Sequence, residues 1–424
     1  MALFPAVGSR RYARRASVLL VLASAPAIGA CQIQSGTASH ARRPSLDAAC
    51  TRPWTVRPVW AGDAPRGLAY PLDHPSVTPF GSTYVLAATT RRPWDDRPMG
   101  DRMAVVSLDG RSFDLPEGAD SGIYPVVGTI GDTLYLVWGE PLPATAGPSG
   151  RLFWPPEVTA VWFASRAGDG PWSTPREIVR AEDVGWGYAN VSIARAPDGS
   201  LELVFTARTS ADYLIVLARF AERDVSVHNV LVNGGPVHSQ MARRGDTAFV
   251  LLVRADTTRM RDQNSLFLAT WHFQSRTWGP QRLVQLGRDE GAVYPRLVAT
   301  PDGALHAVWT QLGANVLRHK VSRDGGATWS APTDLAVPGA YANAAFAIGD
   351  SAVGLLYHDI DFRGPPRAHI ACWNGAWLAP RPLAGDERLS AFSLMDAGRL
   401  AVVAMRPIQG DSQRFEEVIA IPAP

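Results

Sequence analysis

Histidine and tyrosine side chains recur at the start of short apolar segments in this chain. They are His74, Tyr124, Tyr188, His238, Tyr294 and Tyr341, and two positions later stand Ser76, Val126, Asn190, Gln240, Arg296 and Asn343. Residues two apart on a β-strand point the same way. Such groups can satisfy one another along a watery channel. They can also line a polar pocket with an aromatic rim, a common form of carbohydrate site.

Charged residues and one tryptophan flank the same segments. They include the carboxylates Asp183, Glu290 and Asp359, the arginines Arg208 and Arg254, and also Trp186 and His358. Paired carboxylates can act as general acid and as nucleophile or base in sugar hydrolysis. Arginines can hold a sugar carboxylate by bidentate hydrogen bonds, and Trp186 could stack on a sugar face. For any single one of these charges, a solvated loop residue is the simpler interpretation.

The elements that must position these residues are short strands in a repeating unit. Each unit has Tyr or His, an apolar strand, a turn with Asp and Gly, and a second apolar strand. Tyr294–Trp309 is the clearest copy, and the others are His74–Ala88, Tyr124–Trp138, Tyr188–Phe205, His238–Leu252, Tyr341–Tyr357 and the weaker Leu389–Ala404. A period of about 50 residues suits four strands per propeller blade. The sequence predicts an all-β propeller of four-stranded antiparallel blades, with seven blades favoured and six as the alternative.

The last unit ends one strand short of a complete blade. A segment near the other terminus, Trp54–Trp60, resembles the outer strands that follow a tryptophan in other units, such as Trp172–Ile178. We expect Trp54–Trp60 to supply the outer strand of the final blade. This closure would leave no unpaired blade edge and would fix both ends of the domain.

One turn carries a specific pattern, formed by Ser322, Asp324, Gly326, Thr328 and Trp329. Ser and Asp side chains can bond turn amides, and glycine supplies backbone angles that other residues resist. The pattern matches the Asp-box of sialidase-like (BNR) β-propellers, S-x-D-x-G-x-[ST]-W. The resemblance implies a propeller fold and a structural role for the turn, on the rim away from the active site.

The resemblance also implies residue roles, because sialidases bind the substrate carboxylate with three arginines and use a tyrosine nucleophile. Arg208, Arg254 and Arg296 would then form the arginine trio, with Tyr294 or Tyr341 as nucleophile. The chain departs from sialidases in lacking an N-terminal Arg-Ile-Pro motif, and sialidases have six blades. These departures leave the catalytic roles unassigned.

Three functions therefore remain open, since one architecture hosts many activities. The first is a propeller that binds a glycan or another extracytoplasmic ligand in its central pocket. The second is a glycoside hydrolase or polysaccharide lyase acting on acidic sugars, and the third is a protein-binding scaffold. The formal charge is +2, and no long basic run occurs after residue 31, so the sequence does not support nucleic-acid binding. We expect no metal site, because no Cys/His metal spacing occurs. We also expect a monomer without a cofactor.

The N-terminus has the features of a targeting segment. A basic region at Arg10–Arg15 precedes the apolar run Ala16–Ala27, and Ile28–Cys31 resembles the lipobox of bacterial lipoproteins. The resemblance implies cleavage before Cys31 and its acylation; an ordinary signal peptide is the alternative. Ser9–Tyr12 leaves Sec and twin-arginine export both open. We therefore expect a signal peptide at 1–30, a lipidated cysteine and flexible tether at 31–50, and one propeller domain at 51–424.

On this interpretation the protein is exported and is anchored to a membrane, facing the periplasm or the cell surface. Two further cysteines, Cys50 and Cys372, remain in the mature chain. In an oxidising compartment they can form a disulfide. Two separate thiols are an equally good interpretation of the sequence.

Overall fold

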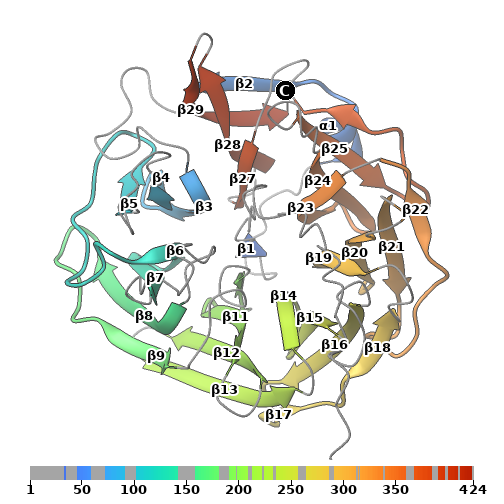
Figure 1. The fold of residues 1–424 in the computed structure, drawn as a ribbon, viewed down its shortest axis with the longest axis horizontal. Coiled ribbons are helices and arrows are strands. Elements are labelled where there is room, and N and C mark those ends of the chain that lie inside the picture. Colours follow the sequence, from blue (N-terminus) through green and yellow to red (C-terminus); the bar gives the residue numbers. More distant parts are fainter. Residues whose placement is uncertain are drawn as a thin grey trace, which may run out of the picture.

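The computed structural model describes residues 33–34, 45–58, 72–90, 102–141, 158–180, 191–196, 198–208, 213–221, 224–232, 235–255, 264–285, 291–311, 314, 316–337, 340–359, 367–383, 390–396, 400–408 and 411–422. Most of them lie in β-strands that surround a common axis (Figure 1). Among the described residues, no helix is both long enough and apolar enough to span a membrane.

Seven sheets are formed by the described strands, and we number them as blades 1 to 7 in chain order. Blade 1 comprises β3(Leu72–Phe80), β4(Thr83–Thr90) and β5(Arg102–Ser107); blade 2 comprises β6(Ile123–Ile130), β7(Thr133–Pro141), β8(Val158–Ala167) and β9(Arg176–Arg180); blade 3 comprises β10(Ser192–Arg195), β11(Leu201–Arg208), β12(Tyr213–Ala221) and β13(Asp224–Val232). Blade 4 comprises β14(Gly235–Arg244), β15(Thr247–Ala255), β16(Ser265–His272), β17(Thr277–Trp278) and β18(Arg282–Gln285); blade 5 comprises β19(Ala292–Ala299), β20(Leu305–Gln311), β21(Val316–Ser322) and β22(Thr333–Leu335). Blade 6 comprises β23(Ala340–Ile348), β24(Ala352–Asp359), β25(Arg367–Trp373) and β26(Arg381–Pro382); blade 7 comprises β27(Ser390–Asp396), β28(Leu400–Ile408) and β29(Asp411–Pro422) with β2(Trp54–Pro58). Six sheets have strands at all four positions of a blade, and blade 1 has three described strands. Each predicted repeat unit therefore lies in a separate sheet of an all-β propeller.

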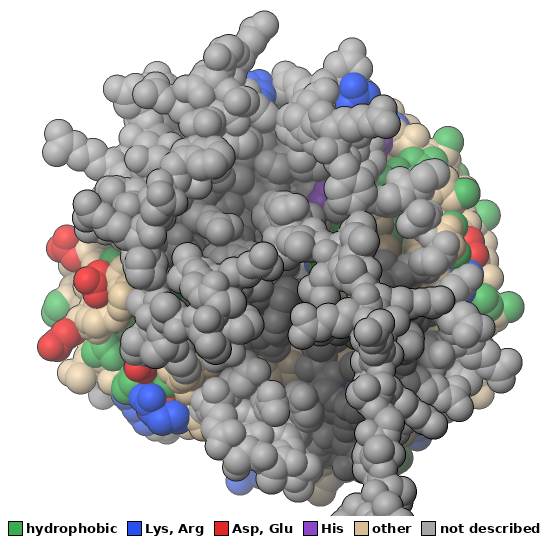
Figure 2. Space-filling model, in the orientation of Figure 1, with side chains coloured by type: hydrophobic (Ala, Val, Ile, Leu, Met, Phe, Trp, Pro, Cys, Tyr) green, Lys and Arg blue, Asp and Glu red, His purple; other side chains and the backbone are tan. Residues whose placement is uncertain are grey.

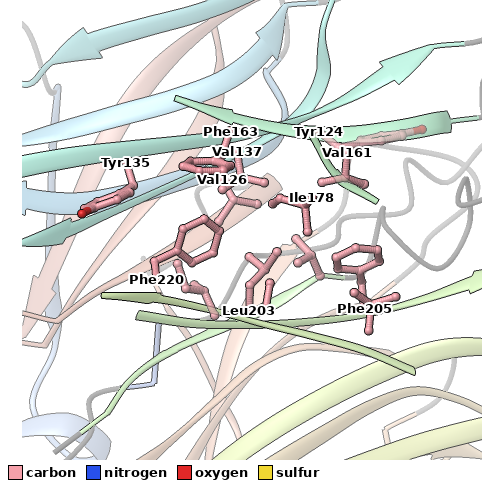
Figure 3. Close-up of a cluster of buried hydrophobic side chains, with 14 of the residues drawn as sticks. Tyr124, Val126, Tyr135, Val137, Val161, Phe163, Ile178, Leu203, Phe205 and Phe220 are labelled. Atoms are coloured by element: carbon pink, nitrogen blue, oxygen red, sulfur yellow. The ribbon is translucent and has the colours of Figure 1, made fainter. Parts of the chain in front are cut away.

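The core lies between neighbouring blades. Second strands such as β20 are buried along their whole length, because a blade lies on either side, and they carry nearly continuous apolar runs. Figure 3 shows the cluster between blades 2 and 3, where Phe163 meets Phe220 edge to face with ring centroids 5.2 Å apart. Burying one such side chain contributes roughly 1.5–3 kcal/mol. Outer strands such as β9 have mostly exposed or half-buried residues and mark the rim.

The first and last described parts of the domain close the ring together. Strand β2 pairs antiparallel with β29, from Trp54 opposite Pro422 to Pro58 opposite Val418, and the two lie side by side in Figure 1. The prediction that the Trp54 segment completes the final blade is confirmed. The final blade thus contains β2 from the N-terminal part of the chain and β29 from the C-terminal part in one sheet.

A second fastening joins the N-terminal segment to blade 6. The short helix α1(Leu46–Cys50) is tied to β25 by a disulfide between Cys50 and Cys372. Arg381 donates hydrogen bonds to the carbonyls of Cys50 (2.6 Å) and Ala49 (3.1 Å). These carbonyls at the end of the helix have no partner within it, so the arginine satisfies them. Of the two interpretations that the sequence left open, the structure has the disulfide.

The turn at Ser322–Trp329 is held by its own side chains. Asp324 accepts hydrogen bonds from the hydroxyl (2.6 Å) and amide (2.9 Å) of Thr328, which lower the pKa of its carboxyl, and the Ser322 hydroxyl accepts one from the Gly326 amide at 2.7 Å. Gly326 has φ +84°, and a Cβ there would collide with the Leu268 side chain of blade 4. Glycine is required on both counts. The turn joins blade 5 to its neighbour and has a structural role.

A further short strand, β1(Ile33–Gln34), lies near the axis. It pairs in parallel with β10, with Ile33 opposite Ile193, and is seen at the centre of Figure 1. The inner edge of a first strand has free backbone donors and acceptors, which is why it can receive an added strand.

Candidate functional site

The candidate site lies at the end of the axis where first strands begin and second strands end, which we call the top face. Just there, the pairing of first and second strands jumps in six of the seven described sheets, all except blade 3. Tyr124 and Tyr294, each followed by proline, stand at such jumps with φ of +52° and +50°. Positive φ is rare for a bulky residue. Bulges of this kind are frequent beside active sites, where they redirect side chains.

Four aromatic rings at the top face run across blades 4, 5 and 6, and we call them the aromatic arc: His238, Tyr294, Tyr341 and His358. Ring centroids are 5.3 Å apart between His238 and Tyr294, 4.7 Å between Tyr294 and Tyr341, and 6.0 Å between Tyr341 and His358. The two tyrosines meet edge to face, a favoured aromatic geometry. The structure thus brings together three of the residues that the repeat singled out and His358, which the sequence analysis placed beside one of the repeated segments.

Polar side chains are buried beside the arc. Arg296, only 1% exposed, donates to the Pro295 carbonyl at 2.9 Å. Gln240 is also 1% exposed, and it lies two residues after His238 on the same face of β14. An amide and a guanidinium buried beside aromatic rings provide the donors and acceptors that orient a ligand in an otherwise apolar pocket.

Burial keeps the arc in its neutral protonation state. It lowers the pKa of His238 to about 3, and the positive charge of Arg296 acts in the same direction. Burial raises the pKa of Tyr294 to about 12, with Tyr341 adding to the shift and Arg296 opposing it. Burial also raises the pKa of Tyr341. At neutral pH the arc therefore offers protonated phenols and the neutral imidazole of His238 next to a permanent cation.

The equivalence of positions between blades differs from the sequence prediction in two cases. Ser192 and Arg296 each stand three residues before the last pair of their hairpin, so Ser192, and not Asn190, is the counterpart of Arg296. In blade 6 the pairing gives Ala344 in place of Asn343. Counting from the tyrosine failed because the spacing varies: it is two residues from Tyr294 to Arg296, three from Tyr341 to Ala344 and four from Tyr188 to Ser192. Counting back from the Asp-Gly turn would have found Ser192.

The side chains of two other predicted residues make their described contacts outside the arc. Tyr124 is buried between blades 2 and 3 among apolar side chains. The guanidinium of Arg254 lies over the Phe267 ring, 4.4 Å from its centroid, and its Nη1 donates to Gln281 at 3.5 Å. Arg254 therefore packs on the outer part of blade 4.

The remaining predicted residues are only partly covered by the structure. The backbones of His74, Arg208, Asn343 and Asp359 lie in β3, β11, β23 and β24, and their side chains are outside the described part. Cys31, Asp183, Trp186, Tyr188, Asn190 and Glu290 lie outside the described residues. Within the described part of the chain, no three His, Cys, Asp or Glu side chains are grouped as a metal site would require.

Comparison with known proteins finds likeness in structure only. No protein-family model matches the chain, and no curated protein matches it. The polysaccharide lyase Uly1 has a TM-score of 0.53 at 11% identity, covering 93% of this chain and 97% of its own. A protein of unknown function from Dyadobacter fermentans has a TM-score of 0.51 at 13% identity, covering 87% and 99%. The Hadza microbial sialidase Hz136 is less similar, with a TM-score of 0.44 at 16% identity over 68% and 63%. At such identities the likeness to the lyase and to the Dyadobacter protein shows a shared fold alone.

Proposed function

We propose that this protein binds an acidic carbohydrate at the top face of the propeller. The observation that carries the proposal is the aromatic arc of His238, Tyr294, Tyr341 and His358, with the Arg296 guanidinium buried beside it. Aromatic rings bind the apolar face of a sugar, and a fixed cation recognises a carboxylate. Figure 2 shows the described Lys, Arg, Asp and Glu side chains around the periphery of the face in view. A uronic acid or another carboxylated sugar fits this arrangement.

Replacing Arg296 with methionine should weaken binding of an acidic oligosaccharide about tenfold to a hundredfold, since a hydrogen bond to a charged group contributes about 1.5–3 kcal/mol. Arg254→Met is the matched control, because Arg254 packs over Phe267 in the outer part of blade 4. A glycan array would identify the ligand, and calorimetry on the folded variants would measure affinity. Equal losses in both variants would contradict the proposed site.

A second candidate is β-elimination from a uronic acid. A base removes the proton on the carbon next to the carboxylate. The released electron pair forms a carbon–carbon double bond, and the glycosidic bond breaks as an acid protonates the leaving oxygen. His238 is a neutral imidazole and Tyr294 a protonated phenol, and Arg296 would stabilise charge on the carboxylate. The fold shared with Uly1 is compatible with this chemistry.

The enzymatic candidates have different products. Elimination from polygalacturonate would create an unsaturated uronide that absorbs ultraviolet light, while hydrolysis would create reducing ends without that absorbance. Binding of the sugar without formation of either product would support the carbohydrate-binding function and exclude both enzymatic candidates for that sugar. Chromogenic glycosides, a sialoside among them, would extend the test to the hydrolase class.

We also propose that the chain is exported and anchored through Cys31. The Ile28–Cys31 sequence supports this, as does the Cys50–Cys372 disulfide, because disulfides persist in oxidising compartments. Cys31→Ser should move the protein from the membrane to the soluble fraction, since acyl chains provide the anchor. Cell fractionation would measure the change, with Cys50→Ser as control. An unchanged membrane fraction for Cys31→Ser would refute the anchor.

A further inference from the structure

One position in the inner strands repeatedly links a blade to its neighbour. In blade 1 the Ser76 hydroxyl accepts a hydrogen bond from the Val127 amide of blade 2, at 3.1 Å. In blade 3 the Ser192 hydroxyl accepts one from the Met241 amide of blade 4, also at 3.1 Å. Both serines are completely buried. A side-chain acceptor at this position therefore has a structural use, which is to join adjacent inner strands.

Gln240 occupies the same position in blade 4. It stands four residues before the last pair of its hairpin, as Ser76 does. Its amide oxygen is buried, yet within the described part of the chain Oε1 has no hydrogen-bond partner. Buried polar atoms are normally hydrogen-bonded, so an exception needs an explanation. Where the serines use their acceptor for the fold, the glutamine has an unused one.

A second buried polar atom without a partner among the described residues belongs to the same strand. His238 is on the same face of β14, and its Nδ1 is likewise buried without a partner among the described residues. The His238 ring lies 5.3 Å from that of Tyr294, which is only half-buried. Two unpartnered polar atoms thus lie on one strand face at the junction of blades 4 and 5, beside a partly open aromatic ring.

We propose that Gln240 and His238 form a hydroxyl-binding subsite at the junction of blades 4 and 5, in which a sugar ring contacts Tyr294 and donates a hydroxyl hydrogen bond to Gln240 Oε1. The proposal rests on the carbohydrate-binding function given above and specifies which group of the sugar is recognised. The carboxylate would be bound by Arg296, and the subsite would bind the neutral part of the same ring.

The chemistry of the two side chains favours a hydroxyl over a charged group. An amide oxygen only accepts hydrogen bonds, so the ligand must donate. A neutral imidazole has one donor and one acceptor nitrogen, and a hydroxyl can serve either. A carboxylate could not donate to Gln240 Oε1. A ring bearing both a carboxylate and free hydroxyls satisfies Arg296 and the subsite together.

The test is a crossed comparison of Gln240→Leu and Ser192→Ala in the full-length protein. The probes are oligogalacturonate, an O-methylated oligogalacturonate that has lost hydroxyl donors, and its methyl ester, which has lost the carboxylate charge. We expect Gln240→Leu to bind oligogalacturonate about tenfold more weakly, to bind the O-methylated probe as the wild type does, and to keep its melting temperature. Ser192→Ala should instead lower the melting temperature and leave affinity unchanged.

Two outcomes would overturn the subsite while leaving the proposed function intact. In the first, Gln240→Leu binds all probes as the wild type does while Arg296→Met loses affinity. In the second, Gln240→Leu behaves like Ser192→Ala, with lower stability and unchanged affinity, so that Gln240 is structural. If the wild type binds none of the probes and no acidic glycan on an array, the proposed function fails and the subsite fails with it.

Discussion

Replacing Cys50 and Cys372 with serine is expected to lower the free energy of unfolding by about 2–5 kcal/mol. The disulfide joins residues 322 apart in sequence and so constrains nearly the whole propeller in the unfolded chain. Loop-closure entropy increases with loop length, which places this disulfide toward the upper part of that range. Chemical denaturation of the oxidised wild type and of the double variant would measure the difference.

Two comparisons separate the disulfide from the other contacts of α1. Reduction of the wild type should give the same loss as the double serine variant. Arg381→Met, which removes the hydrogen bonds to Ala49 and Cys50 but keeps the disulfide, should cost about 1–3 kcal/mol. An unchanged denaturation midpoint for the double variant would show that β2 pairing alone closes the ring.

Acidification is expected to destabilise the protein strongly between pH 6.5 and about pH 4. Burial lowers the pKa of His238 to about 3, of His306 to about 4 and of His319 to about 3, from an ordinary value of 6.5. Below pH 6.5 these three histidines are therefore protonated in the unfolded chain but remain neutral in the folded chain. Stability is complete above pH 6.5 and falls as the pH drops toward the folded pKa values. At pH 5 the loss is about 2 kcal/mol for each histidine.

Two of these histidines form a pair that can be tested directly. His306 Nδ1 lies 3.1 Å from His319 Nε2, with the rings stacked and Trp373 edge-on to both. The double variant His306→Gln, His319→Gln should lose much less stability than the wild type between pH 7 and pH 5. His272→Gln, at a partly exposed position, should keep the steep profile. A wild type equally stable at pH 7 and pH 5 would disprove the account.

The sequence by itself determined the architecture, because the signals that specify a blade are local. Paired apolar strands separated by glycine-containing turns predicted each hairpin, and each predicted unit lies in its own sheet. The short last unit and the spare Trp54 segment predicted closure, since an unpaired blade edge is unfavourable. The turn at Ser322 was visible because its hydrogen bonds form within a few residues of chain.

The site was only partly readable, because it depends on which blades meet. The sequence named His238, Tyr294, Tyr341 and His358 separately, but their contacts cross three blades and required the fold. Arg254 was grouped with Arg296 by residue type, and packing placed it over Phe267 in the outer part of blade 4.

Strand register and covalent closure were decided only by the tertiary structure. The number of residues between the aromatic residue and the equivalent strand position differs between blades, so Ser192, and not Asn190, is the counterpart of Arg296. The Cys50–Cys372 disulfide depended on the ring bringing together residues 322 apart, a distance at which sequence spacing has no meaning. The Gln240 amide oxygen, which has no hydrogen-bond partner among the residues that the structure describes, is likewise a property of the assembled blades, since it appears only when neighbouring inner strands are compared.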